Sequence, residues 1–130
     1  MLPAAPIFEL RRTFRFEAAH RLPHVPADHK CARLHGHSFE VDVVVGGSLD
    51  ARVGWVMDYA DLKEAAGPVI DELDHRYLNE LDGLANPTSE VLCVWLWQRL
   101  APRLAGLYAI TVRETCTTAC TYRGPAGGAR

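Results

Sequence analysis

The sequence predicts an α+β domain in which two helices cover one face of a four-stranded antiparallel sheet. Four stretches alternate apolar and polar residues, as half-buried strands do. Two stretches between the second and third of these carry apolar residues at helical spacing. The order strand, strand, helix, helix, strand, strand is typical of a sheet with its helices gathered on one side.

The first two strands carry the histidines that dominate the candidate site. The first is predicted over residues 9–21, and its apolar face ends at His20. The residues that follow contain two prolines and no clean period, as a loop does. The second strand is predicted over residues 35–45 and starts with His35 and His37 on its apolar face. Strands that flank a loop most simply pair antiparallel, so His20 is expected beside the other two histidines.

The two helices are predicted over residues 58–73 and 86–100. Pro68 lies inside the first pattern and is expected to kink or split that helix. The second begins with N-P-T-S-E, in which Asn86 or Thr88 can serve as the N-cap. The run V-L-C-V-W-L-W that follows is apolar nearly all round, so this helix should be buried on most sides.

The last two strands are predicted over residues 107–115 and 118–123. In the first of them Glu114 ends an otherwise apolar face, where a carboxylate needs a partner. Two interpretations stay open for Glu114. It pairs with Arg113 or another neighbour, or it accepts two parallel hydrogen bonds from a planar N–H pair of a ligand.

Length and composition indicate a single folded domain, residues 1–130, whose ordered core we expect over about residues 8–124. Hydrophobic residues make up 48% of the chain and charged residues 23%, the mix of a soluble globular protein. The net charge of −2 gives no reason to expect nucleic acid or an anionic membrane as partner. No apolar run approaches the 18 or so residues of a membrane span.

The N-terminus and the cysteines indicate the compartment. The first twelve residues lack a basic segment followed by an apolar one, so we interpret them as a short flexible lead rather than a signal peptide. The last eight residues, R-G-P-A-G-G-A-R, are expected to form a loose tail. The four cysteines, in a chain this apolar and without a secretory signal, are expected to be reduced thiols. These features favour a cytoplasmic protein.

The motif His35-Gly-His37 is the strongest local signal of chemistry. Residues two apart on a strand point the same way, so both imidazoles can bind one ion. With His20 they form three neutral nitrogen ligands, and three histidines with an open position are typical of catalytic zinc. Zinc is favoured over copper or iron because the chemistry inferred below needs no redox change. The alternative is that the three rings pack or hydrogen-bond separately.

Three further residues are candidates whose roles the spacing leaves open. Cys31, four residues before the H-G-H motif, is a fourth ligand, a base or nucleophile beside the metal, or a loop thiol without a role. Asp74 and His75 are a base and its orienting partner, or a helix cap. Adjacent residues do not point together on regular structure, which favours the cap.

Several motifs in order resemble those of the 6-pyruvoyl-tetrahydropterin synthase superfamily over about residues 8 to 124. They are F-E-A-A-H-R-L-P, C-A-R-L-H-G-H-S-F, G-W-V-M-D-Y-A-D-L-K, L-D-H-R-Y-L-N, N-P-T-S-E and V-R-E-T-C-T-T-A-C-T-Y-R-G. An ordered set of this kind is far more specific than any one motif. The resemblance implies a tunnelling fold whose subunits join into a barrel, typically a homohexamer built as a dimer of trimers, with active sites between subunits.

The resemblance also assigns roles to residues of this chain. It implies zinc ligands at His20, His35 and His37, a catalytic thiol at Cys31 and a catalytic pair at Asp74 and His75. It further implies a pterin-binding glutamate at Glu114, which can also join the proton relay, and it places Thr88 in the segment that lines the pterin pocket. No nicotinamide or nucleotide cofactor is implied.

The implied activity is that of a zinc-dependent carbon–carbon lyase of queuosine biosynthesis, a tRNA modification pathway. Its substrate is 7,8-dihydroneopterin triphosphate, and its products are 6-carboxy-5,6,7,8-tetrahydropterin, acetaldehyde and triphosphate. Only three residues separate Cys31 from the H-G-H motif, which favours this carboxy branch of the family. The alternatives are the pyruvoyl branch, which eliminates triphosphate without cleaving a carbon–carbon bond, and a zinc-stabilised pterin-binding domain without turnover.

Overall fold

A mixed sheet of five strands forms one layer of the structure, a computed structural model that describes residues 8–125. The sheet order is β3-β1-β2-β4-β5. The bounds are β1 Phe8–His20, β2 His35–Gly47, β3 Arg76–Tyr77, β4 Leu107–Arg113 and β5 Cys120–Tyr122. Four of the strands pair antiparallel, whereas β3 runs parallel to β1. The prediction of four strands, all antiparallel, is therefore wrong, since it lacks the parallel strand β3. A strand of two residues is too short to show an alternation of apolar and polar residues.

The pairing of β1 with β2 is the predicted one and sets the position of the site. The register is unbroken from Phe8 opposite Gly47 to His20 opposite His35. It also places Ala18 opposite His37. The end of the first strand therefore meets the start of the second, as the loop between them requires.

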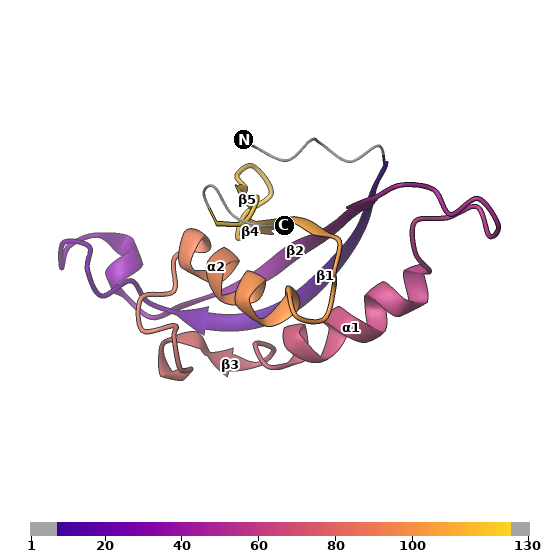
Figure 1. The fold of residues 1–130 in the computed structure, drawn as a ribbon. Helices are drawn as coiled ribbons and strands as arrows, with labels where there is room; N and C mark the ends of the chain where they lie inside the picture. Colours follow the sequence, from indigo (N-terminus) through magenta and orange to yellow (C-terminus); the bar gives the residue numbers. More distant parts are fainter. Residues whose placement is uncertain (1–7, 126–130) are drawn as a thin grey trace.

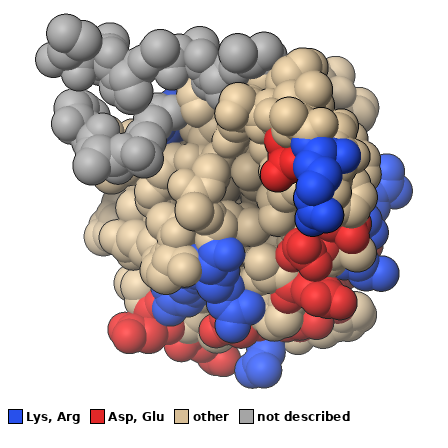
Figure 2. All heavy atoms as spheres, turned by 45° about the vertical axis from the view of Figure 1, so that its right-hand side comes forward, with Lys and Arg blue, Asp and Glu red and all other residues tan. Residues whose placement is uncertain are grey.

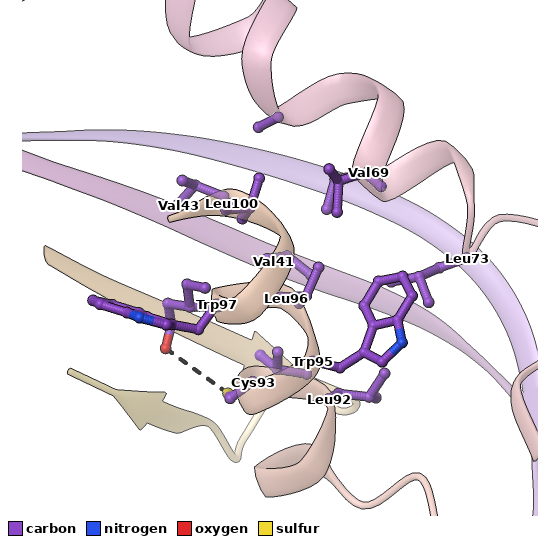
Figure 3. Close-up of a cluster of buried hydrophobic side chains, with 14 of the residues drawn as sticks. Val41, Val43, Val69, Leu73, Leu92, Cys93, Trp95, Leu96, Trp97 and Leu100 are labelled. Atoms are coloured by element: carbon purple, nitrogen blue, oxygen red, sulfur yellow. Dashed lines mark hydrogen bonds between the residues drawn. The ribbon is translucent and has the colours of Figure 1, made fainter. Parts of the chain in front are cut away.

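Both helices lie on the same side of the sheet (Figure 1). Helix α1 spans Tyr59–Asp71 and α2 spans Ser89–Leu100, with short 3-10 turns at Lys30–Ala32 and Leu78–Glu80. Their apolar side chains pack on the alternating apolar residues of the strands, and Figure 3 shows α2 pressed against β2 and the end of α1. The fully buried members of this core include Phe39, Val41, Val43, Leu62, Leu73, Leu92, Leu96, Leu100 and Ile110.

The side of the sheet without helices carries a polar network centred on Asp42, which is 2% exposed. Arg113 donates to both carboxylate oxygens of Asp42, at 3.0 and 2.8 Å, and Thr13 donates at 2.7 Å. Burial opposes ionisation of Asp42, but these hydrogen bonds outweigh it and lower the pKa of the carboxyl. The network therefore ties three strands together through one charged group.

The predicted helices agree with the structure within two or three residues. Asp58 caps α1 by accepting from the backbone N–H of Ala60, and Thr88 caps α2 by accepting from Val91. Pro68 lies in the last turn of α1 and does not split the helix, which runs from Tyr59 to Asp71. None of the described helices is both long and apolar enough to cross a bilayer.

The predicted lead and tail fall mostly outside the described part of the chain, at residues 1–7 and 126–130. The remainder of the lead is not loose, since β1 already begins at Phe8. All four cysteines carry free thiols, as expected. In the right-hand and lower parts of Figure 2, acidic and basic side chains lie next to one another, without a large area of one sign.

Candidate functional site

Three histidines from the paired ends of β1 and β2 form the centre of the site. One nitrogen from each of His20, His35 and His37 lies within 4.8 Å of the other two. The ring centroids are 4.6 Å apart for His20 and His35, 5.2 Å for His20 and His37, and 4.8 Å for His35 and His37. The antiparallel pairing that was predicted from alternation and the connecting loop thus brings the three imidazoles together, and their nitrogens could hold one metal ion.

Two of these rings are oriented by backbone carbonyl groups. The Nδ1 atom of His20 lies 2.9 Å from the carbonyl oxygen of Pro87, and Nδ1 of His35 lies 2.7 Å from that of Arg33. A carbonyl oxygen only accepts, so each Nδ1 carries the proton and donates it. In the neutral form of each ring the lone pair then sits on Nε2, the arrangement that positions a histidine to bind a metal through Nε2.

His20 is 1% exposed, and its Nε2 atom has no hydrogen-bond partner among the described residues. A buried polar atom without a partner is costly, and a metal ion would supply that partner. Burial is also the main cause that lowers the pKa of His20 below its ordinary 6.5, outweighing the opposing effects of the Pro87 carbonyl and Glu114. Burial lowers the pKa of His37 in the same way. Both rings are therefore held neutral, which is the form that binds metals.

Glu114 follows the end of β4 and faces two of the three histidines. Its carboxylate oxygens lie 4.0 Å from Nε2 of His20 and 3.9 Å from Nε2 of His37. Of the predicted pairing with Arg113 or another neighbour, the Arg113 part is wrong, because Arg113 pairs with Glu40 and Asp42. The neighbours that Glu114 faces are the two imidazoles. Glu114 thus places a carboxylate beside the three imidazoles without a hydrogen bond to either of these two.

Cys31 lies in the 3-10 turn of the loop between β1 and β2, and its residue is partly buried. Its backbone N–H donates to Nδ1 of His29 at 3.0 Å. Its carbonyl oxygen accepts from the backbone N–H of Leu22 at 2.7 Å, which folds the turn back against the end of β1. No described hydrogen bond joins the Cys31 thiol to the three histidines.

Asp74 and His75 form a contacting pair, although they are adjacent in the sequence. Nδ1 of His75 lies 3.0 Å from Oδ1 of Asp74. The contact is possible because His75 has a φ of 58°, a left-handed conformation that regular structure does not contain. The backbone N–H of Glu17 also donates to Asp74 at 2.9 Å and is the main cause that lowers the pKa of this carboxyl. His75 is exposed, Asp74 is partly buried, and the pair is anchored to β1 through the backbone of Glu17.

The hydroxyl group of Thr88 does not contact the three histidines. The segment of Thr88 is connected to them by a backbone carbonyl group of the preceding residue. Its Oγ1 atom is occupied by the cap of α2, and the residue before it, Pro87, supplies the carbonyl group that binds His20. The sequence predicts a cap within N-P-T-S-E but not this contact. The supporting carbonyl groups of Pro87 and Arg33 were missed because any residue type can provide a backbone acceptor.

Comparisons with known proteins point to one family. A family profile described as 6-pyruvoyl tetrahydropterin synthase matches residues 9–125. A 6-carboxy-5,6,7,8-tetrahydropterin synthase of Synechocystis is 42% identical over 120 residues, which cover 88% of this chain and 92% of that protein. A 6-pyruvoyl tetrahydrobiopterin synthase of Drosophila melanogaster is 36% identical, covering 92% and 82%. The structure of 6-pyruvoyl tetrahydropterin synthase from Caenorhabditis elegans superimposes with a TM-score of 0.84 at 30% identity, covering 95% of this chain and all of that one.

Proposed function

The chain belongs to the 6-pyruvoyl tetrahydropterin synthase family, and from this premise we propose that it is a zinc-dependent lyase of queuosine biosynthesis. It converts 7,8-dihydroneopterin triphosphate to 6-carboxy-5,6,7,8-tetrahydropterin, acetaldehyde and triphosphate. The observation that carries the proposal is the cluster of His20, His35 and His37, whose nitrogens could hold one metal ion, with the carboxylate of Glu114 beside two of the rings. The name of the Synechocystis relative supports the carboxy product.

The three histidines would hold Zn²⁺, the ion that favours neutral nitrogen ligands in a site with an open position. Their fit rests on the orphaned Nε2 of His20 and on the Nδ1–H tautomers that the carbonyl groups impose. When bound, the ion supplies Lewis-acid polarisation of the substrate's side chain.

The remaining residues bind the substrate and move protons. Glu114 anchors the planar N–H edge of the pterin through two parallel hydrogen bonds, and the segment of Thr88 lines the pterin pocket. The Cys31 thiolate removes protons from the substrate's side chain. His75 carries protons to and from that side chain, and Asp74 holds His75 in one tautomer.

The protein functions as a single domain within an assembly in the cytoplasm. We propose that the sheets of several copies join into a barrel, as a homohexamer made of two trimers. Assembly would bring the thiol of Cys31 and the pair of Asp74 and His75 to a common substrate, since no described contact joins them within one chain. The substrate is a small molecule, and neither nucleic acid nor membrane takes part.

A product assay tests this function. The zinc-loaded protein is incubated with 7,8-dihydroneopterin triphosphate, acetaldehyde is trapped, and the products are identified by mass spectrometry. Carboxy-pterin together with acetaldehyde supports the proposal. Pyruvoyl-pterin without acetaldehyde would assign the chain to the other branch, which the Drosophila relative represents. Tight pterin binding without any product would leave a zinc-stabilised binding domain.

A further inference from the structure

A hollow of about 530 Å³ opens where β1, β2 and β3 lie side by side. Its lining includes Glu17, His37, Ser38, His75, Arg76 and Tyr77. One metal-ligand candidate and one member of the proposed catalytic pair thus border the same space. Arg76, which directly follows that pair, has no role in the function proposed above.

Arg76 is the one cation in this lining, and it is exposed. Among the residues that the structure describes, it has no hydrogen-bond or ion-pair partner for its side chain. The nearby carboxylates are already engaged. Glu17 accepts from the hydroxyl group of Ser38 at 2.8 and 2.7 Å, and Asp74 contacts His75 and the backbone of Glu17. The guanidinium group is therefore available to an anionic ligand.

The register places Arg76 in line with the three-histidine cluster. Arg76 lies opposite Ala18 on β1, and Ala18 lies opposite His37 on β2. Two strand spacings separate the backbones of Arg76 and His37 by about 10 Å. Ala18 between them has only a methyl group, so no bulky side chain divides the row.

We propose that Arg76 binds the triphosphate group of the substrate. The proposal rests on the function proposed above, in which the reacting side chain also carries the triphosphate, so this anion must lie near the site. A guanidinium group suits it, because its planar set of N–H donors pairs with two phosphate oxygens at once. Arg76 thereby holds the leaving group, while Glu114 holds the pterin at the other end of the substrate.

The test compares two ligands on three variants of the zinc-loaded protein. Binding of inorganic triphosphate and of neopterin, which lacks phosphate, is measured by calorimetry for Arg76→Gln, Arg76→Lys and the control Arg52→Gln. Arg52 is an exposed arginine in the loop before α1. We expect Arg76→Gln to weaken the binding of inorganic triphosphate by at least about tenfold, because the variant loses the charge-assisted hydrogen bonds of the guanidinium group. Arg76→Lys should retain part of the affinity, and Arg52→Gln all of it.

The neopterin affinity and the metal content should be the same in all variants. Chelation of zinc by the probe affects each protein equally, so the ratio of affinities is the readout. Wild-type affinity of Arg76→Gln for inorganic triphosphate would overturn the assignment, as would failure of the wild type to bind it. Failure of the proposed function is a separate result, namely absence of product from a wild type that binds both ligands.

Discussion

The Nδ1 atom of His20 lies 2.9 Å from the carbonyl oxygen of Pro87, although 67 positions separate the two residues. The contact ties the end of β1 to the turn that starts α2. It sets the tautomer of a buried ring whose other nitrogen has no partner in the described chain. The orientation of this candidate metal ligand therefore depends on how α2 packs on the sheet.

Replacement of His35 by Ala should remove the metal. Loss of one of three nitrogen ligands costs more than the roughly 100-fold in affinity that a supporting residue contributes. Metal content after gel filtration, measured by plasma mass spectrometry, is expected to fall from stoichiometric to a small fraction. The control is His24→Ala, which alters an exposed loop histidine. Stoichiometric zinc in both His35→Ala and His37→Ala would exclude the three-histidine site.

Cys31→Ala should keep the metal and the fold but lower turnover by at least about 100-fold, the usual contribution of a general base. The matched control is Cys116→Ala, because Cys116 is an exposed thiol in the turn between β4 and β5. The rate of product formation and the zinc content are measured on the same samples. Unchanged turnover would remove Cys31 from the mechanism, and lost zinc would make it a ligand.

Glu114→Gln should weaken pterin binding about tenfold while zinc stays bound, because the amide replaces a charged acceptor by a neutral one. Neopterin affinity, followed by fluorescence, provides the measurement. Glu72→Gln, at the exposed end of α1, serves as the control. Equal affinity in wild type and Glu114→Gln would rule out the role of Glu114 as pterin anchor.

Asp42→Asn should destabilise the fold by about 2 kcal/mol, since Arg113 and Thr13 lose a buried charged acceptor. The pKa of Asp42 is lower in the folded protein than its ordinary 3.8. Its ionised form therefore stabilises the fold above pH 3.8, and this contribution is lost as the pH falls through 3.8 toward the lowered pKa. Urea unfolding between pH 3 and 7 should show a smaller loss of stability in acid for Asp42→Asn than for the wild type.

Asp28→Asn, which alters an exposed loop carboxylate, is the control for that comparison. An acid-induced loss of stability identical in Asp42→Asn and the wild type would show that other carboxylates dominate it. The zinc-free protein is used, so that metal release in acid does not enter the measured free energies.

The histidine cluster could be predicted because it depends on the alternation of side chains along two strands and on the loop that joins them. The side-chain period of two fixes which face each residue occupies, and the single loop fixes which strand ends meet. His20, His35 and His37 follow from these two facts alone. Glu114 follows in part, since its place at the end of an apolar face was evident but its neighbours were not.

The contact between Asp74 and His75 could not be predicted in the same way. It depends on the left-handed backbone of His75, which histidine adopts more often than most residues but which the sequence around it does not specify. Strand β3 was missed for a related reason, as its two residues pair with a strand more than 50 positions away. Both features depend on contacts between distant parts of the chain, and a pattern of neighbouring residues does not predict such contacts.

The brevity of β3 has a consequence for the motions of this region. Its ladder joins β1 at two positions, whereas β1 and β2 pair over all 13 residues of each strand. A segment held by so few hydrogen bonds opens locally, and this opening costs only a fraction of the free energy of global unfolding. Amide protons of β3 should therefore exchange with deuterium by local opening, well before those of β1 and β2. A ligand that contacts Arg76 would slow this exchange, so deuterium uptake in β3 reports occupancy of the hollow even when no reaction occurs.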